Sequence, residues 1–209
     1  IEDKIATLKS QLANHEFIWV AGSTHPGEYE QVISAHLALL EKKPNALLII
    51  APRHPEQFNK VADYLKQNNM SFSQRSKEAH TRQGVLLADT MGEMLVLFGA
   101  SQCAFIGGSL IERGGPNPLE AAAFNIPIIT GPSYTNFLHV YPKLISSNAC
   151  LCVDSSSALF DNLISLSNDP EKRRMLGANA YQILKANRGA LNRTFTLIEN
   201  EITHDTVTH

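Results

Sequence analysis

Short apolar runs alternate along the chain with segments whose apolar positions recur every three or four residues. The apolar runs are rich in β-branched and aromatic side chains and end in small residues, as is typical of strands buried in a parallel sheet. The apolar runs predict strands over 17–23, 46–52, 84–89, 103–108, 126–132 and 150–154. The helical spacing predicts helices over 1–14, 28–40, 55–68, 91–100 and 136–145, and a further helix that begins near Asn117. The polar segment 71–82 is expected to contain a short edge strand and a loop.

This alternation predicts an α/β fold, a doubly wound, Rossmann-like parallel sheet with helices on both faces. Beyond residue 154 the strand signal disappears, and the spacing predicts helices over 155–167, 170–186 and 190–202. The serine run 155–157 is expected to cap the first of them, and residues 203–209 are expected to fray. No repeat or linker divides the sequence. We therefore expect one domain over 1–209, with a core at about 15–154 and a helical tail over 155–209.

Composition narrows the class of protein. The 18 basic and 20 acidic residues give a net charge of −2, which does not favour nucleic-acid binding. No apolar run is long enough to span a membrane, and no signal peptide is recognisable. The three cysteines, Cys103, Cys150 and Cys152, are interpreted as buried strand thiols in a reducing compartment. Because the first residue is Ile1 and not Met, the sequence is expected to be part of a longer chain or a processed chain.

Candidate chemistry follows the predicted strands, since open α/β sheets bind ligands at the carboxyl ends of their strands. The turns 90–92 and 115–117 precede predicted helices, whose N-termini offer free N–H groups and the positive end of a dipole. Arg53 adds a bidentate donor suited to phosphate or carboxylate. Together these features predict a site for an anion that carries hydroxyl groups, such as a nucleotide sugar.

Glu120 has two interpretations that the sequence leaves open. With Asn117 as N-cap, Glu120 lies three residues later and forms a pair that resembles a capping box. Alternatively, Glu120 accepts hydrogen bonds from ribose hydroxyls. The glycines do not form a dinucleotide-binding fingerprint or a P-loop, and the histidines lack metal-ligand spacing, so no metal site is expected. His25, His54 and His139 are interpreted as surface or hydrogen-bonding residues rather than as catalytic bases.

Six ordered motifs resemble the C-terminal half of 3-deoxy-D-manno-octulosonic acid (Kdo) transferases. The set is specific because all six keep their order and spacing over residues 21–137. The motifs are A-x-S-T-H-x-G-E (21–28), A-P-R-H-P-E (51–56), D-T-M-G-E (89–93), F-I-G-G-S-L (105–110), G-G-x-N-P-L-E (114–120) and G-P-x-x-x-N-F (131–137).

The resemblance implies the C-terminal half of a GT-B glycosyltransferase, in which two Rossmann-like domains face each other across a cleft. This half would bind the donor CMP-Kdo. The N-terminal half, absent from this sequence, would bind the acceptor, a lipid A precursor, contact the membrane and supply the catalytic base. The parent enzyme would be inverting and independent of metals and cofactors, and would build lipopolysaccharide at the cytoplasmic face of the bacterial inner membrane. This chain alone is expected to be inactive, and Glu28 is not assigned the role of the base.

The resemblance also implies which residues bind the donor. Arg53 is expected to pair with a donor anion, the turn at 91–93 to place backbone N–H groups against the nucleotide, and Glu120 to hold the ribose. The expected binding residues are Ser23, Thr24, Pro52, Arg53, Met91, Gly92, Glu93, Asn117, Pro118, Leu119 and Glu120. The sequence departs from the family at Pro116, where relatives often carry His, and at Ala121, where they often carry Pro.

Other functions share parts of this pattern. A GT-B transferase or an epimerase that uses a UDP-sugar would have the same sheet, glycine-rich turn and helix-borne glutamate. A noncatalytic nucleotide-binding module is a further alternative, because half of the parent enzyme is missing. A response-regulator or flavodoxin-like domain is disfavoured, because no cluster of aspartates follows the first strand.

Overall fold

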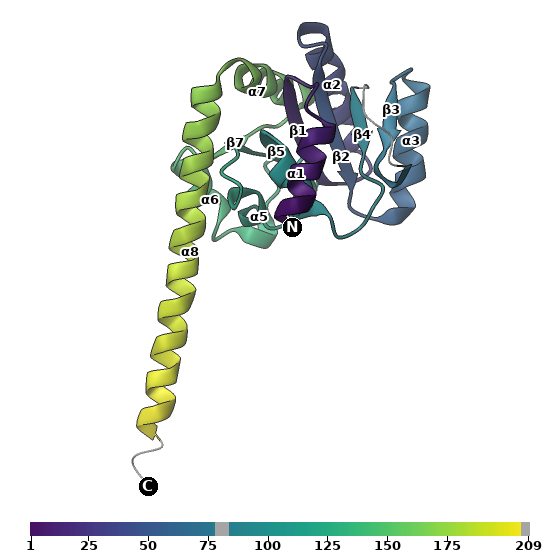
Figure 1. Cartoon of the computed structure of the whole chain (residues 1–209). Coiled ribbons are helices and arrows are strands. Elements are labelled where there is room, and N and C mark those ends of the chain that lie inside the picture. The colour runs from purple at the N-terminus through teal and green to yellow at the C-terminus, as the bar shows by residue number, and fades with distance from the viewer. Residues whose placement is uncertain (78–83, 206–209) are drawn as a thin grey trace.

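All seven strands of the computed structural model, which describes residues 1–77 and 84–205 and the side chains up to residue 189, pair in parallel within one sheet. The strand order is β3-β4-β2-β1-β5-β6-β7 (Figure 1). The strands are β1 (Phe17–Thr24), β2 (Ala46–Pro52), β3 (Phe72–Gln74), β4 (Val85–Leu87), β5 (Cys103–Ile106), β6 (Ile128–Thr130) and β7 (Cys150–Cys152). From β1 the chain builds one half of the sheet, in which β4 is inserted between β2 and the edge strand β3, and from β5 it builds the other half outward to β7. The predicted doubly wound parallel sheet is confirmed, and its order reverses between β1 and β5.

Helices cover both faces of the sheet (Figure 1). Side chains of α1, α4, α5, α6 and α8 pack on one face. Those of α2, α3 and α7 pack on the other, together with Leu176 from α8. The helices are α1 (Glu2–Gln11), α2 (Tyr29–Lys42), α3 (Phe58–Gln67), α4 (Met94–Ala100), α5 (Leu119–Ala122), α6 (Tyr141–Ser146), α7 (Ser156–Asn168) and α8 (Pro170–Asp205). Three 3₁₀ turns are η1 (Pro55–Gln57), η2 (Arg75–Lys77) and η3 (Thr135–Phe137).

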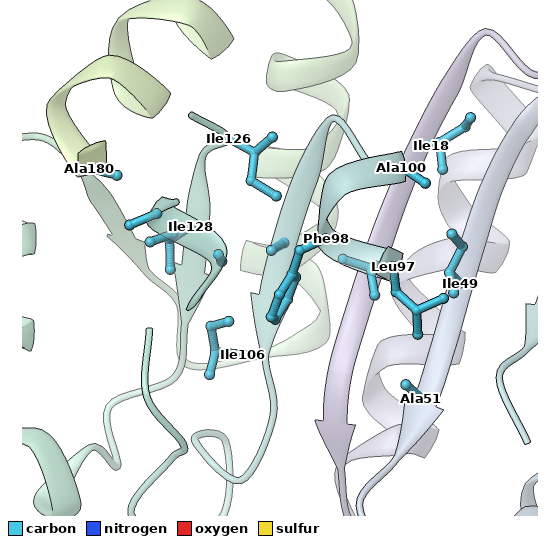
Figure 2. Packing of buried hydrophobic residues seen from close by; sticks show 14 of the residues in the cluster. Ile18, Ile49, Ala51, Leu97, Phe98, Ala100, Ile106, Ile126, Ile128 and Ala180 are labelled. Carbon is cyan, nitrogen blue, oxygen red and sulfur yellow. The ribbon is translucent and has the colours of Figure 1, made fainter. Parts of the chain in front are cut away.

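The central strand β1 divides the core into two clusters. Every residue of β1 is buried, and its side chains alternate, so Trp19 joins one cluster while Ile18 and Val20 join the other. Figure 2 shows part of the cluster that contains Ile18 and Val20, in which Leu97 and Phe98 of α4 point toward the sheet. Burial on both faces explains why the strands read as continuous apolar runs.

Single residues delay the start of two predicted helices. The helix predicted from residue 91 begins at Met94, because Gly92 has a φ of +76°, which is incompatible with a right-handed helix. The helix predicted over 136–145 is replaced by η3 and then α6, in which Pro142 lies in the first turn. Proline removes an N–H donor and collides with the preceding turn, so a helix tolerates it at its start and not in its interior.

The C-terminal tail also differs from the prediction. Residues 170–205 form one helix, α8, and not two, because the isolated Gly189 weakens a helix by only about 1 kcal/mol and does not end it. The expected fraying of 203–209 is wrong for 203–205, which are helical, and 206–209 lie outside the described residues. The serine cap is confirmed, since Ser155 Oγ accepts a hydrogen bond from the Ala158 amide. The expected extent of the domain stays a prediction.

A close approach at Gly177 fixes α8 against the rest of the chain. A Cβ atom at this position would lie 1.8 Å from the carbonyl oxygen of Asn125, in the connection between α5 and β6. Because no side chain can occupy that space, only glycine allows the helix to pack this closely. Ala180 and Leu184 continue the contact into the core.

The loop after β5 is held by a buried carboxylate that the sequence did not reveal. Glu28, just before α2, is fully buried and accepts hydrogen bonds from three consecutive amides, Gly108, Ser109 and Leu110, at 2.6, 3.0 and 3.0 Å. Desolvation raises the pKa of Glu28, and the amide hydrogen bonds offset part of this increase. The carboxylate thus joins the start of α2 to the glycine-rich loop.

A second buried polar connection links β1, α2 and the start of β4. Trp19 Nε1 donates to His36 Nδ1 at 3.1 Å, and His36 Nε2 lies 2.7 Å from the Gly84 carbonyl oxygen. His36 is therefore a neutral imidazole that accepts at Nδ1 and donates at Nε2. Burial lowers its pKa to about 4.

We expect His36 to make the protein less stable in acid. Below pH 6.5 the unfolded chain binds a proton at His36 and the native state does not, so the free energy of unfolding falls until about pH 4. The shift corresponds to a loss of about 3 kcal/mol over this range. Urea unfolding at several pH values tests it, with His36→Gln as the non-titrating control. If the free energy of unfolding changed with pH equally in the wild-type chain and in His36→Gln, the assignment of a low pKa to His36 would be contradicted.

We expect Glu28→Gln to destabilise the protein by about 3 kcal/mol, because one amide oxygen cannot replace a carboxylate that accepts three backbone hydrogen bonds. Denaturant unfolding measures the change. Glu41→Gln, which removes an exposed carboxylate from the other end of α2, is the matched control and should leave stability unchanged. Equal stability of the two variants would show that the carboxylate does not hold the loop.

Candidate functional site

A concave region lies at the carboxyl ends of the strands, around the point where their order reverses. Its volume is about 670 Å³, within the range of small-molecule sites. The segments that line it follow β1, β2, β4, β5 and β6, as expected for an open α/β sheet. We call this region the main cleft.

Eight of the eleven expected binding residues line the main cleft. They are Ser23, Pro52, Arg53, Met91, Gly92, Glu93, Asn117 and Glu120. The other three do not. Thr24 is fully buried, Pro118 is buried, and Leu119 packs against the core. Thr24 is buried at the end of β1 in this structure, and the expectation that it contacts a sugar or phosphate stays a prediction.

The Thr90–Glu93 turn is shaped by Glu93. The Glu93 carboxylate receives Arg75 Nη2 at 3.1 Å and Nε at 3.3 Å, and it also accepts a hydrogen bond from Thr90 Oγ1. Desolvation raises the pKa of Glu93, but the hydrogen bonds from Thr90 and Arg75 and the charge of Arg75 outweigh it and hold the pKa below its usual value. Since the carboxylate is occupied within the protein, Glu93 positions the turn, and the backbone of the turn is left to face a ligand.

A neighbouring carboxylate anchors the same turn from its other end. Asp89 accepts hydrogen bonds from the Ser76 amide at 2.8 Å, from Ser76 Oγ at 2.6 Å and from Gln74 Nε2 at 3.0 Å. With the Arg75–Glu93 pair, these contacts attach the turn to β3 and η2. Arg75 was missed in the sequence because it lies in a polar segment that belongs to none of the six motifs.

Arg53 is the cation placed most directly on the main cleft. Its backbone amide is fixed to the Thr24 carbonyl oxygen at 3.0 Å, while its side chain is exposed. Within residues 1–77 and 84–189, its guanidinium forms no salt bridge. It is therefore free to bind an anion in the bidentate manner that its shape favours.

A further part of the main cleft is lined by Gly115, Pro116, Asn117 and Glu120. Gly114 and Gly115 have φ values of +81° and +62°, and the Pro116 carbonyl accepts a hydrogen bond from Tyr141 Oη at 3.1 Å. Asn136, which belongs to the last motif but was not assigned a role from the sequence, donates Nδ2 to the carbonyls of Arg113 and Gly115. These contacts fix the glycine-rich turn without a ligand.

The two interpretations of Glu120 are now distinguishable. Asn117 Oδ1 accepts a hydrogen bond from the Leu119 amide at 3.1 Å, so Asn117 does satisfy a backbone donor at the start of α5. In the part of the chain whose side chains are described, however, Glu120 returns no hydrogen bond to Asn117, and its side chain is exposed at the main cleft. The capping box is incomplete, and the Glu120 carboxylate is available to a ligand.

All three cysteines are free thiols. Cys103 and Cys150 are buried as expected, whereas Cys152 is exposed near the end of the edge strand β7. No cluster of three or more His, Cys, Asp or Glu residues in the described part of the chain is arranged to hold a metal ion. No described helix has the length and apolar character needed to cross a membrane.

Comparisons with known proteins agree with this geometry. The family model of glycosyl transferases group 1 matches residues 11–183. The 3-deoxy-D-manno-octulosonic acid transferase of Haemophilus influenzae is 42% identical over 94% of this chain and 47% of its own length. The corresponding transferase of Bordetella pertussis is 32% identical over 85% of this chain and 43% of its own length. The chain therefore spans less than half the length of these relatives.

Among solved structures, a C-terminal domain gives a close match. It is the crystal structure of the C-terminal CMP-Kdo binding domain of WaaA from Acinetobacter baumannii, with 33% identity and a TM-score of 0.82 over 87% of this chain and 96% of that one. This match confirms the C-terminal domain fold of a GT-B glycosyltransferase. The chain belongs to the group 1 glycosyl transferases and is a homologue of the C-terminal domains of Kdo transferases.

Proposed function

We propose that the chain is the donor-binding domain of an enzyme that transfers Kdo from CMP-Kdo to a lipid A precursor in lipopolysaccharide biosynthesis. The observation that supports the proposal is the main cleft, where Arg53, the 90–93 turn and Glu120 come together near the point where the strand order reverses. The similar C-terminal domain of WaaA is described as a CMP-Kdo binding domain. A cationic side chain, open backbone and a free carboxylate match the phosphate, base and ribose of a nucleotide.

Each element of the main cleft would take one part of the donor. Arg53 would bind the phosphate, and the fixed turn at 90–93 would present its backbone to the nucleotide. Glu120 would accept hydrogen bonds from the ribose. Since the leaving group of the transfer is CMP, a cation at the phosphate also stabilises the charge that develops as the bond to the sugar breaks.

The rest of the reaction would depend on the other half of the parent enzyme. Attack by an acceptor hydroxyl requires a base, and the proposal places that base, the lipid acceptor site and the contact with the cytoplasmic face of the inner membrane in the N-terminal domain. The transfer would invert the anomeric carbon without a metal or cofactor. On this proposal the isolated domain binds the donor but does not catalyse sugar transfer.

We expect the chain to bind CMP more tightly than UMP or UDP, as measured by titration calorimetry. Arg53→Ala should weaken CMP binding by about tenfold or more, because a charge-assisted bidentate contact is removed. Arg174→Ala is the matched control, since Arg174 is an exposed arginine on α8 whose partner is Glu171 on the same helix.

The alternatives make different predictions in the same titration. Tighter binding of UDP would favour a UDP-sugar transferase or epimerase. A noncatalytic nucleotide-binding module would be favoured by two results together: this chain binds CMP, and the intact parent protein transfers no sugar. In the parent enzyme, Arg53→Ala with an unchanged kcat/KM would contradict the role of Arg53 in stabilising the leaving phosphate.

A further inference from the structure

A smaller recess adjoins the main cleft, and the proposed function does not assign it. Its volume is about 210 Å³, and it contains side chains of Ser23, His25, Arg53, His54 and Arg113. Ser23 and Arg53 also line the main cleft, so the two share a wall. We call this region the basic recess.

Every ionisable side chain that lines the basic recess is basic. These four side chains come from the loops after β1, β2 and β5, and no carboxylate lines the recess. The rings of His25 and His54 meet edge to face, with centroids 5.6 Å apart. Burial, followed by the charges of His54, Arg113 and Arg53, lowers the pKa of His25, as expected where positive charge is not neutralised.

Backbone amides of the adjacent loop cannot serve an anion in the basic recess. In many nucleotide-binding folds, the N–H groups of a glycine-rich loop bind the ligand's phosphates. Here the amides of residues 108–110 already donate to the buried carboxylate of Glu28. An anion in the recess therefore depends on the side chains of His25, Arg53, His54 and Arg113.

The wall between the two regions is conformationally strained. Ser23 is 7% exposed and has a φ of +58°, in the left-handed region that non-glycine residues rarely adopt. The strain coincides with a register shift between β1 and β2, and a Cβ at Gly107 would lie 2.5 Å from the Ser23 carbonyl oxygen. Such strained residues cluster at ligand sites, and here the strain lies where the main cleft meets the basic recess.

We propose that the basic recess is a second anion subsite, which holds the carboxylate of the donor's sugar while the main cleft holds the nucleotide. The inference rests on the proposed function. In an ulosonic acid the carboxylate is bonded to the anomeric carbon, which in the donor also carries the phosphate oxygen. The donor thus presents two anions side by side. Two adjoining regions with Arg53 between them match this arrangement, with His25 and Arg113 contacting the carboxylate.

The test compares ligands that differ only in the sugar and its carboxylate. Calorimetry is performed with CMP, with CMP-Kdo and with a CMP-Kdo analogue whose carboxylate is converted to the carboxamide. Arg113→Met and His25→Gln should each weaken CMP-Kdo binding by about tenfold, and leave CMP binding within about twofold. Binding of the carboxamide should be weak in the wild-type chain and insensitive to Arg113→Met. Arg174→Met is the control, and thermal unfolding verifies that each variant is folded.

The other outcomes overturn the inference. Equal weakening of CMP and CMP-Kdo by Arg113→Met would assign the recess to the nucleotide phosphate instead. Unchanged binding of CMP-Kdo in both variants would show that the recess is not part of the donor site. Failure of the wild-type chain to bind either CMP or CMP-Kdo would contradict the proposed function itself, which distinguishes that failure from a failure of the second subsite alone.

Discussion

The buried carboxylate of Glu28 is the constraint on which the site depends. A carboxylate removed from water must be stabilised by hydrogen bonds, and here three consecutive amides of the loop after β5 provide them. The same contacts fix the loop that follows β5, next to the point where the strand order reverses. Because Glu28 lies in the connection between β1 and α2, these hydrogen bonds join that connection to the loop after β5. Ser23, at the end of β1, and Arg113, in the loop after β5, both line the basic recess.

A second consequence concerns how the site recognises charge. A glycine-rich loop with free amides can bind a phosphate through its backbone, whereas here the protein's own carboxylate occupies those amides. In the proposed donor site, anions are therefore recognised by arginine and histidine side chains that follow β1, β2 and β5. The Arg75–Glu93 pair likewise neutralises charge within the protein, so that the turn after β4 offers backbone and apolar surface to the ligand.

The sequence predicted the sheet well because strands buried on both faces leave an unmistakable apolar pattern. It failed where single residues override periodicity, as Gly92 does before α4 and Pro142 does at the start of α6. The motifs placed eight of the eleven expected binding residues at the main cleft, but motifs do not give side-chain burial, so the sequence did not distinguish the buried Thr24 from the residues that line the cleft. Glu28 was missed because its three partners lie some 80 positions away in sequence.

The close contact at Gly177 determines the direction in which the long helix α8 leaves the domain. Asp205 lies 28 positions beyond Gly177, which corresponds to about 42 Å of helix, and this distal part extends beyond the sheet (Figure 1). The helix would tilt about its contact with the Asn125 carbonyl, where its backbone packs with no side chain between. A tilt of about 5° at that point moves the far end by about 4 Å. A side chain added at Gly177 would therefore displace the C-terminal end of the helix much more than it displaces the backbone at the contact.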